Sequence, residues 1–418
     1  MSTTVKIVPP HFSIKGEVSL PVSKSISNRI LMLKAYSGDL SHEVTEKDVG
    51  DTLLLKKLLL EIAQAPREER VVLNCLNAGT VLRFLLAFVA QREGEWILTG
   101  SERMCERPIE PLVKALRVLG AEIFYEGREG FPPLRVVGKP LSSQVVEVDT
   151  SISSQFVSSL LLLSTVIPGG LSLKLTGEKV STSYMRMTMK LLQKASMRVV
   201  EDDGVIRVSP GKLRTEALTP EADWSSAAFW FALVALSQRG KILIKGVGEP
   251  EDSLQGDAVV ADIFRSIGVA FHVTPEGVLI QKPYQVPALS RVRLNMKSTP
   301  DLTLPVVTAL SGLGYGALIS GIHHLQFKES DRIKALVTEL RALNVAIDYV
   351  DRMLVVHPSS VRAFRPVNTY DDHRMAMAFA PLSLVLGTLD VRDPQVVEKS
   401  YPHFWEMLKG LGFGLRMS

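Results

Sequence analysis

Residues 23–29 place three hydroxyl groups, an amide and two cations directly before an apolar run. The segment reads Ser-Lys-Ser-Ile-Ser-Asn-Arg, and Ile30 to Leu33 follow it. Such a transition is typical of a helix start, where backbone N–H groups are free and the helix dipole is positive. With Lys24 and Arg29 added, the segment predicts a site for phosphate or carboxylate. An ordinary capped helix with two solvated cations is the plain alternative.

Five more polar clusters precede apolar segments, at residues 77–80, 105–108, 151–155, 328–332 and 371–374. The small residues at 77–80 would let a backbone approach a ligand, and Pro108 suits a first helical turn. The serines and glutamine at 153–155 offer uncharged donors. The charged run 328–332 is predicted to begin a helix, and Asp371 or Asp372 to cap another.

Each cluster has a simple structural explanation, because caps, tight turns and solvated charged faces are common. Taken together they are less ordinary, because four of the six clusters carry cations near a predicted helix N-terminus. This recurrence predicts an enclosed site for a ligand set with several negative charges. The cations are Lys24, Arg29, Arg107, Lys328, Arg332 and Arg374.

Composition and missing motifs exclude several functional classes. The net charge of +4 is small and dispersed, which argues against nucleic acid binding. GxxxxGK[ST] and GxGxxG patterns are absent, so ATP and NAD are not favoured. Two cysteines without CxxC spacing fit a reducing cytosol, and we expect no metal, since His373 has no partner at metal spacing. No secretory or membrane-spanning segment is evident, so a cytoplasmic protein is expected.

A weak internal repeat indicates the fold class. The repeated form is an amphipathic helix, a glycine and a strand start, seen at 112–123, 259–273 and 336–350. Segments 189–200 and 403–417 fit more loosely, and 51–62 lacks the turn. Gly120, Gly268 and Gly412 suit the left-handed position after the helix, and Asn344 replaces glycine in one copy. We therefore expect an α/β chain of about six related units.

The length of 418 residues favours more than one domain, because single cores stop growing near about 250–300 residues. The best candidate boundary is 209–223, which is rich in proline, glycine and polar residues. It divides the chain roughly in half. Because the cations occur in both halves, we expect the halves to enclose the ligands between them and to close on binding.

The motifs resemble those of the EPSP synthase (5-enolpyruvylshikimate-3-phosphate synthase) family. SKSISNR, NAGT..R, ERPI, SISSQF, the DL run at Asp301, KESDR and DDHRMAM occur in the family's order, from about Leu20 to Leu408. The resemblance implies a two-domain inside-out α/β barrel, each domain built from three βαβαββ units. It places one domain at 21–221, on the shikimate 3-phosphate side. Residues 1–20 with 222–418 form the other, which carries the phosphoenolpyruvate and acid/base groups.

The resemblance also implies an activity. The family transfers the enolpyruvyl group of phosphoenolpyruvate to shikimate 3-phosphate, within the shikimate pathway of aromatic amino acid biosynthesis. A tetrahedral intermediate forms and phosphate is eliminated, with no metal or organic cofactor. Glyphosate mimics phosphoenolpyruvate in this family. We expect these two small molecules to be the only partners, and the protein to be a monomer.

The family pattern implies roles for individual residues. Asp301, Glu329, Lys24 and Lys328 match the catalytic groups, with Asp301 as proton acceptor and Glu329 as proton donor. Shikimate 3-phosphate is expected to contact Lys24, Ser25, Arg29, Ser153, Ser154, Gln155, Ser181, Tyr184, Asp301, His324 and Lys328. Phosphoenolpyruvate is expected to contact Lys24, Gly79, Arg107, Gln155, Arg332, Arg374 and Lys399.

Four positions depart from the family pattern. Leu76 and Phe84 replace a glycine and a proline that often flank the NAGTxxR motif. Thr182 begins a Thr-Ser pair where Lys-Pro is common, and His324 stands where asparagine often contacts the shikimate phosphate. None of these changes removes an expected catalytic group, although Phe84 could alter the surroundings of Gly79 and the response to glyphosate.

Two other functions fit parts of the pattern. The sister family transfers enolpyruvyl to UDP-N-acetylglucosamine, but it usually carries Lys-Asn at the position of Lys24-Ser25 and a cysteine on a mobile loop. Cys105 is the only candidate for that cysteine, and it lies at a variable position of the EPSP synthase motif. A catalytically silent phospho-ligand binding protein would lack the acid/base residues, whereas Asp301, Lys328 and Glu329 are present.

Overall fold

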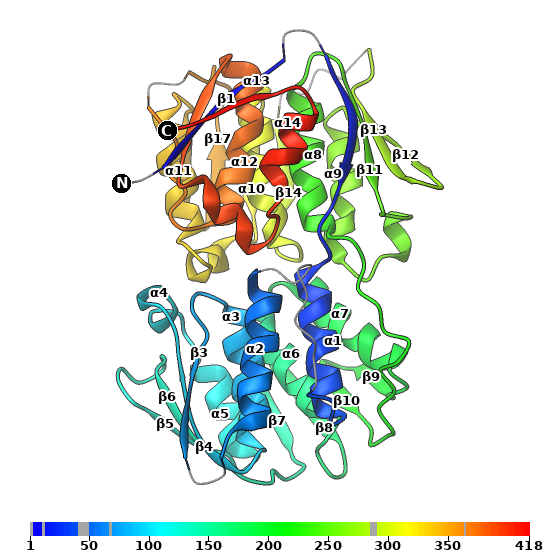
Figure 1. The fold of residues 1–418 in the computed structure, drawn as a ribbon, viewed down its shortest axis with the longest axis vertical. Coiled ribbons are helices and arrows are strands. Elements are labelled where there is room, and N and C mark those ends of the chain that lie inside the picture. The colour runs from blue at the N-terminus through cyan, green and yellow to red at the C-terminus, as the bar shows by residue number, and fades with distance from the viewer. Residues whose placement is uncertain (1–2, 11–12, 41–49, 67–68, 285–290, 363–364) are drawn as a thin grey trace. The chain divides into compact units, whose positions relative to one another are not determined.

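The chain forms two compact units (Figure 1). The computed structural model describes residues 3–10, 13–40, 50–66, 69–284, 291–362 and 365–418. Unit 1 comprises residues 1–23, 221–326 and 330–418, and unit 2 comprises residues 24–220 and 327–329. The two segments that leave unit 1 pair with each other, because Val22 and Ala222 form an antiparallel bridge and Asp223 N–H donates to the Pro21 carbonyl at 2.9 Å.

Unit 2 begins with two helices and then repeats one βαβαββ pattern twice. Its elements are α1 (Lys24–Tyr36), α2 (Gly50–Gln64), β3 (Arg70–Asn74), α3 (Gly79–Ala90), β4 (Gly94–Thr99), α4 (Glu102–Cys105), α5 (Glu110–Val118), β5 (Glu122–Tyr125), β6 (Leu134–Gly138), β7 (Val145–Asp149), α6 (Ser154–Leu163), β8 (Leu171–Thr176), α7 (Thr182–Lys194), β9 (Val199–Asp202) and β10 (Val205–Val208). The sheet orders are β3-β4-β6-β5 and β7-β8-β10-β9. In both sheets the first pair is parallel and the other pairs are antiparallel.

Unit 1 repeats the same pattern, with both chain ends built into it. Its first elements are β1 (Thr4–Val8), β2 (Ile14–Ser19), α8 (Trp224–Leu236), β11 (Gly240–Lys245), η1 (Pro250–Asp252), η2 (Gly256–Val259), α9 (Val260–Ser266), β12 (Ala270–Thr274), β13 (Gly277–Gln281) and β14 (Arg291–Asn295). They continue with η3 (Pro300–Leu302), α10 (Thr303–Gly312), β15 (Gly316–Ser320), η4 (His323–Phe327), α11 (Arg332–Ala342), β16 (Ile347–Val350) and β17 (Met353–Val356). The last are α12 (His373–Phe379), η5 (Ala380–Leu382), α13 (Ser383–Leu386), β18 (Leu389–Arg392), η6 (Pro394–Lys399), α14 (Phe404–Gly410) and β19 (Gly414–Met417).

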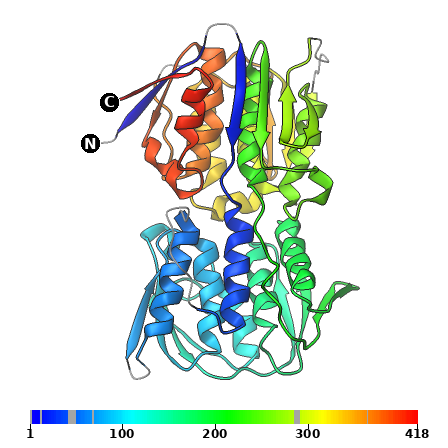
Figure 2. The same cartoon turned by 45° about the vertical axis from the view of Figure 1, so that its right-hand side comes forward.

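The sheets of unit 1 join residues that are far apart in the sequence. β2 pairs in parallel with β11 in the sheet β12-β13-β11-β2, although the whole of residues 24–220 lies between them in the chain (Figure 2). The sheet β14-β15-β17-β16 follows the same order. In the third sheet, β18-β1-β19, the N-terminal strand β1 lies between two C-terminal strands.

The predicted helix–turn–strand repeat is confirmed in five copies. Helices α5, α7, α9, α11 and α14 each precede the third strand of their repeat. The predicted left-handed residues have positive φ, with 100° at Gly120 and Gly268, 91° at Gly412 and 65° at Asn344. Ser196, with φ of 67°, fills this position in the fourth copy. Around 51–62 no such turn follows, since α2 leads to β3, which is the first strand of the next repeat.

Buried helices form the centre of each unit. In unit 2, α1, α3 and α6 pack against one another, and in unit 1, α8, α10 and α12 do so. Every residue of α8 is buried, while strands such as β2 and β7 alternate between buried and exposed residues. A helix that is apolar on all sides belongs in a core, whereas alternation is typical of a sheet with one exposed face. This α/β arrangement, with helices inside and sheets outside, agrees with the predicted fold class.

Two predicted helix starts were placed too early. Pro108 does not lie in a first helical turn, because α5 begins at Glu110 and Pro111 occupies that position. The run 328–332 does not begin a helix at Lys328 either. Instead α11 begins at Arg332, and the Asp331 side chain accepts a bond from Lys334 N–H at the cap.

Candidate active site

The predicted site residues are distributed over both units, and many lie at the N-terminal ends of the buried helices. Unit 2 holds Lys24, Ser25, Arg29, Gly79, Arg107, Ser153, Ser154, Gln155, Ser181, Tyr184, Lys328 and Glu329. Unit 1 holds Asp301, His324, Arg332, Arg374 and Lys399. Free N–H groups and the positive dipole at such helix ends favour anions.

Lys24 is the first residue of α1, and its ammonium contacts the Asp51 carboxylate of α2 at 3.2 Å. The Lys24 side chain keeps 20% of its surface exposed, whereas the Asp51 side chain keeps 9%. The ion pair therefore holds the ammonium near the N-terminus of α1 and leaves part of the Lys24 side chain accessible to solvent. Asp51 was missed in the sequence because its partner is 27 residues away.

Arg29 is buried between α1, α6 and α7. Its guanidinium donates to Thr188 Oγ1 at 2.7 Å, Ser158 Oγ at 3.0 Å and the carbonyls of Ser25 and Tyr184 at 2.8 and 3.3 Å. Burial lowers the pKa of Arg29 to about 10, and the nearby Tyr184 partly offsets this effect. These four acceptors are neutral, so an anion brought close to this guanidinium would gain from its weakly compensated charge.

A second cationic cluster surrounds Gly79, the first residue of α3. A Cβ atom added to Gly79 would lie 2.4 Å from Arg83 Nη1 and 2.5 Å from Arg107 Nη2. Both arginines are buried, with 3% and 4% of their surface exposed. Arg83 donates to Gln155 Oε1 at 3.0 Å, and the Gln155 amide donates to Thr80 Oγ1 at 2.9 Å. Glycine thus lets two guanidinium groups approach the start of α3.

The two guanidinium groups beside Gly79 disfavour each other's charge. Burial lowers the pKa of Arg83 well below its usual value, the Arg107 charge lowers it further, and Glu329 opposes the shift. Two buried like charges are costly unless an anion joins them. The sequence motif NAGT..R contained Arg83, but only the structure places it beside Arg107.

Serine residues mark the starts of α6 and α7. Ser153 caps α6, and its hydroxyl accepts the Gln155 N–H at 3.2 Å, while Ser154 is 4% exposed. Ser181 precedes α7 in a left-handed conformation with φ of 53°. A left-handed serine is strained, and such strain collects at functional sites. The predicted helix start at 151–155 is confirmed.

The segment Phe327–Glu329 is held through its backbone within unit 2. Its three carbonyl groups accept, in chain order, from Arg107 Nε at 3.1 Å, Arg103 Nη2 at 3.2 Å and Asn77 Nδ2 at 3.4 Å. Three side-chain donors on three consecutive carbonyls fix the path of this segment. Arg103 was not predicted as a site residue, because nothing local in the sequence links it to residue 328.

In unit 1, two arginines and two carboxylates form one cluster. Arg332 Nη1 and Arg374 Nη2 each contact one oxygen of Asp301, both at 2.9 Å. Arg332 Nε donates to Asp372 Oδ2 at 2.8 Å, and Ser330 Oγ donates to the same oxygen at 3.1 Å. Asp372 also caps α12 by accepting the Arg374 N–H at 3.0 Å. The cluster brings the predicted Asp301, Arg332 and Arg374 together, and Asp372 is an additional member.

Asp257 adds a third buried carboxylate near this cluster. It is 2% exposed, and Ser225 Oγ donates to it at 2.5 Å. Burial and the charges of Asp301 and Asp223 raise the pKa of Asp257, the Ser225 bond and Arg374 lower it, and the resulting pKa is about 6. No local signal in the sequence indicates this residue, because its partners come from the starts of α8, α10 and α12.

Replacement of Asp257 by asparagine is expected to change the pH dependence of stability. A carboxyl with a raised pKa binds its proton more tightly in the folded state, so its contribution to stability falls as pH rises between about 4 and 6. The melting temperature of the variant minus that of wild type should therefore be larger at pH 7.5 than at pH 5. Thermal unfolding at both values checks this. An equal difference at both pH values would contradict the assignment.

The predicted residues His324 and Lys399 lie at the ends of unit 1 elements. His324 is 1% exposed in η4, and Lys399 is the last residue of η6. His373, which the sequence does not predict to bind a metal, is 1% exposed at the start of α12. Among the described residues, no group of three or more histidine, cysteine or acidic side chains could hold a metal ion.

Comparison with known proteins decides the family. The sequence model of the EPSP synthase (3-phosphoshikimate 1-carboxyvinyltransferase) family matches residues 9–408. The chain belongs to the EPSP synthase family. A relative from Bacteroides fragilis, named 3-phosphoshikimate 1-carboxyvinyltransferase, is 38% identical over 409 residues, which is 97% of each chain. One of the same name from Vibrio cholerae is 32% identical and covers 94% of this chain and 96% of its own.

A solved EPSP synthase from Acinetobacter baumannii shares the fold. The alignment covers 100% of both chains with a TM-score of 0.74 and 20% identity. In the part of the chain that the structure describes, no helix is long and apolar enough to cross a membrane. Cys75 and Cys105 are both free cysteines.

One departure from the EPSP synthase pattern contacts a site residue directly. The ring of Phe84, on α3, lies under the Arg29 guanidinium at 5.4 Å from the ring centroid, in cation–π geometry. Leu76 has a φ of 48° and is 55% exposed, so the glycine common there in the EPSP synthase family is replaced by a strained residue. Thr182 begins α7.

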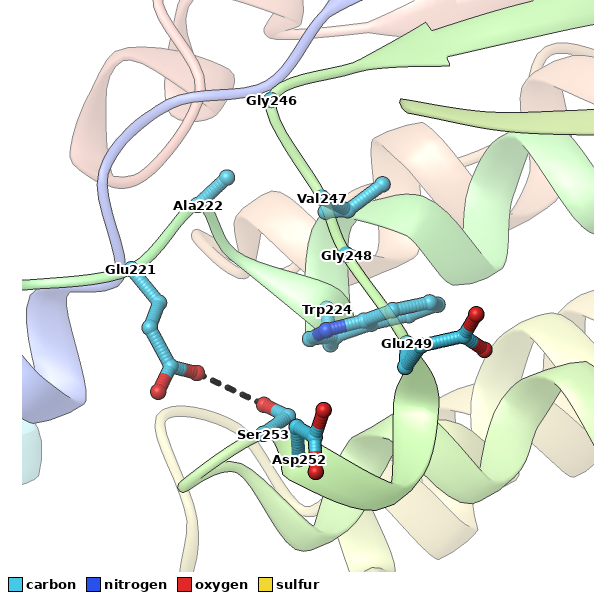
Figure 3. Close-up of a pocket in the computed structure, with 9 residues that line it drawn as sticks. All are labelled: Glu221, Ala222, Trp224, Gly246, Val247, Gly248, Glu249, Asp252 and Ser253. Carbon is cyan, nitrogen blue, oxygen red and sulfur yellow. Dashed lines mark hydrogen bonds between the residues drawn. The ribbon is translucent and has the colours of Figure 1, made fainter. Parts of the chain in front are cut away.

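A separate pocket in unit 1 does not suit anionic ligands (Figure 3). Its volume is about 270 Å³, and its polar lining includes Glu221, Glu249 and Asp252, around the side chain of Trp224. The Glu221 carboxylate accepts from Ser253 Oγ at 2.7 Å. None of the predicted site residues lines this pocket. Its acidic lining would repel phosphate and carboxylate groups.

Proposed function

We propose that this protein transfers the enolpyruvyl group of phosphoenolpyruvate to the 5-hydroxyl of shikimate 3-phosphate and releases inorganic phosphate. The observation that carries the proposal is the complete set of family motif residues, for two anions and for proton transfer, in a chain of this family. The name shared by its relatives, 3-phosphoshikimate 1-carboxyvinyltransferase, describes the same transfer. The activity belongs to the shikimate pathway, which leads to aromatic amino acids.

The two substrates would bind through largely different groups, with Lys24 and Gln155 shared between them. We propose that residues 21–221 supply most of the shikimate 3-phosphate contacts and several phosphoenolpyruvate contacts. Residues 1–20 with 222–418 supply the remaining phosphoenolpyruvate contacts and most of the acid/base groups. Arg29 has only neutral oxygens among its four acceptors, so a substrate carboxylate or phosphate would complete its charge balance. The other proposed shikimate 3-phosphate contacts are Lys24, Ser25, Ser153, Ser154, Gln155, Ser181, Tyr184, Asp301, His324 and Lys328.

For phosphoenolpyruvate, the arginine cluster at Gly79 is the strongest support. Arg83 and Arg107 are buried together, and a phosphate or carboxylate beside Gly79 would relieve their repulsion. We therefore add Arg83 to the residues expected to hold this substrate. The other proposed contacts are Lys24, Gly79, Arg107, Gln155, Arg332, Arg374 and Lys399.

The proposed chemistry is an addition followed by an elimination. Asp301 takes the proton of the 5-hydroxyl as the hydroxyl oxygen bonds to C2 of phosphoenolpyruvate. Glu329 gives a proton to C3, which becomes a methyl group. In the second step a methyl proton returns to the enzyme and the bond from C2 to the phosphate oxygen breaks. Lys24 and Lys328 stabilise the charge and assist proton transfer.

We further propose that the protein acts as a monomer in the cytoplasm and needs no metal or organic cofactor. Two free cysteines are compatible with a reducing compartment. The proposed reaction transfers protons and an enolpyruvyl group without any change of oxidation state, so acid and base groups suffice.

Phosphate release from the purified protein tests the function. Shikimate 3-phosphate and phosphoenolpyruvate are supplied together and each is omitted in turn. We expect release only with both substrates. Release with UDP-N-acetylglucosamine in place of shikimate 3-phosphate would instead assign the sister activity. Binding of both substrates without release would indicate a catalytically silent protein.

Gly79→Ala is expected to weaken phosphoenolpyruvate binding. The added methyl group would meet Arg83 Nη1 at 2.4 Å and Arg107 Nη2 at 2.5 Å, so both guanidinium groups must move. Since a displacement of about 1 Å can cost about 100-fold, we expect the KM for phosphoenolpyruvate and the inhibition constant for glyphosate to rise by that order.

Gly127→Ala is the matched control, because its Cβ would meet only Pro133 Cδ, at 3.8 Å. Initial-rate kinetics on both variants check the prediction. An unchanged KM in Gly79→Ala would show that the two arginines do not bind phosphoenolpyruvate.

A further inference from the structure

Glu339 is a buried carboxylate that accepts several hydrogen bonds from residues 365–370 of unit 1. It lies on α11 and is 1% exposed. Its oxygens accept from Arg365 Nη2 at 3.3 Å, from the N–H and side-chain amide of Asn368 at 3.2 and 3.1 Å, and from Tyr370 Oη at 2.7 Å. Four donors from residues 365–370 therefore converge on one side chain of α11.

The residues after this anchor form a strained turn. Tyr370 and Asp371 are consecutive left-handed residues, with φ of 55° and 54°. The Asp372 N–H donates to the Thr369 carbonyl at 2.9 Å and closes the turn. Positive φ at both central positions is the pattern of a type I′ turn, which favours Asn-Gly or Asp-Gly and disfavours tyrosine. Something other than local preference must hold Tyr370 there.

The turn ends at Asp372, which contacts the side chain of Arg332 and the backbone N–H of Arg374. Asp372 is fully buried and accepts from Arg332 Nε at 2.8 Å and from the Arg374 N–H at 3.0 Å. Arg332 and Arg374 then both contact Asp301. Arg332 is the first residue of α11, the helix that also carries Glu339. The segment 365–372 is thus fixed to one helix at two points.

We propose that Glu339 and Tyr370 are positioning residues for Arg332 and Arg374, because their hydrogen bond holds the strained turn that places Asp372. The inference rests on the proposed function, in which these arginines bind phosphoenolpyruvate. Glu339 and Tyr370 act through Asp372 and do not touch the substrate.

The properties of the Tyr370 hydroxyl agree with a permanent anchor. Partial burial, together with the hydrogen bond and charge of Glu339, raises the pKa of Tyr370 to about 12, and Arg365 partly offsets these effects. The hydroxyl therefore stays protonated, and remains a donor, over the pH range in which an enzyme works. The hydrogen bond to a buried charged acceptor is of the strong kind.

Tyr370→Phe removes only this hydroxyl and keeps the ring. We expect the KM for phosphoenolpyruvate to rise about 10-fold, with kcat and the KM for shikimate 3-phosphate within about threefold of wild type. Tyr349→Phe, on β16 of the same unit, is the matched control and should match wild type. An unchanged KM for phosphoenolpyruvate, or an equal rise in both KM values, would overturn the proposal.

A rescue variant separates positioning from general stability. Because glycine adopts positive φ without strain, Asp371→Gly should make the turn favourable by itself. Added to Tyr370→Phe, it should return the KM for phosphoenolpyruvate to within about threefold of wild type. Failure to recover this KM would show that the turn is not what the Tyr370 hydroxyl maintains.

A stability measurement keeps the inference testable apart from the proposed function. Tyr370→Phe and Asp372→Asn are made singly and together, and the melting temperatures are compared. Coupled residues are not additive, so the double variant should lose less than the sum of the single losses. Additive losses would overturn the inference. Absence of turnover in the wild-type protein would overturn the proposed function alone.

Discussion

Glu329→Gln is expected to lower turnover by about 100-fold or more while shikimate 3-phosphate binding stays within about threefold. The amide keeps the shape of the side chain but cannot donate the proton that C3 requires. Because the proposed role of Glu329 is proton transfer, the loss should appear in kcat. Steady-state kinetics and a direct binding measurement with shikimate 3-phosphate check the prediction.

Asp301→Asn is expected to reduce kcat by a similar order, about 100-fold, and to raise the KM for phosphoenolpyruvate as well. The structure explains the difference, since both Asp301 oxygens contact guanidinium groups at 2.9 Å. An amide NH₂ would face one of them and repel it. Asp348→Asn, at a half-exposed ion pair with Arg341, serves as control and should leave both constants unchanged. Near-wild-type turnover in both Glu329→Gln and Asp301→Asn would refute the acid/base roles.

Arg83→Gln is expected to change stability and activity in opposite directions. The buried Arg83 guanidinium is disfavoured by burial and by Arg107, so a neutral side chain should keep or raise the melting temperature. At the same time kcat/KM for phosphoenolpyruvate should fall by roughly 30-fold or more, because the loss of a buried contact between charged groups costs about 2 kcal/mol or more.

The control for Arg83→Gln is Arg135→Gln, whose partially exposed guanidinium pairs with Glu95 and Glu126 on the surface of unit 2. This variant should leave kcat/KM unchanged and alter stability little, because surface ion pairs contribute little. If Arg83→Gln unfolded much more readily and kept its kcat/KM, Arg83 would be a structural residue.

Local rules in the sequence predicted the elements that depend on local contacts. The left-handed positions at Gly120, Gly268, Gly412 and Asn344 follow from what a helix end requires, and the structure confirms all four. The start of α6 at Ser154 is likewise a local capping event. The repeated helix–turn–strand pattern was sufficient to predict an α/β fold of related units.

Errors arose where two local signals competed. Pro108 and Pro111 both suit a first helical turn, and only the structure places α5 after the first of them. In the run 328–332, the cap is Asp331, and the backbone of the three residues from Phe327 is held by side chains of unit 2. Periodicity alone cannot distinguish a charged loop from a charged first turn.

Contacts between residues that are distant in the sequence could not be predicted. Asp372 contacts Arg332 across 40 residues, and Asp257 contacts Ser225 across 32. Glu339 lies in a predicted amphipathic helix, and nothing near it in the sequence indicates the four donors that contact its carboxylate. The resemblance to the EPSP synthase family supplied the roles proposed for Asp301, Lys328 and Glu329, while the structure added Arg83 and the groups that hold the arginines.

The most direct test of the central claim is the reaction of both substrates in D₂O, with the organic product analysed by mass spectrometry. Addition and elimination pass through a methyl group, so the account predicts an enolpyruvyl ether of shikimate 3-phosphate with deuterium in its methylene group, together with inorganic phosphate. A product without deuterium would contradict the proton transfers proposed for C3. No enolpyruvyl product at all would contradict the function.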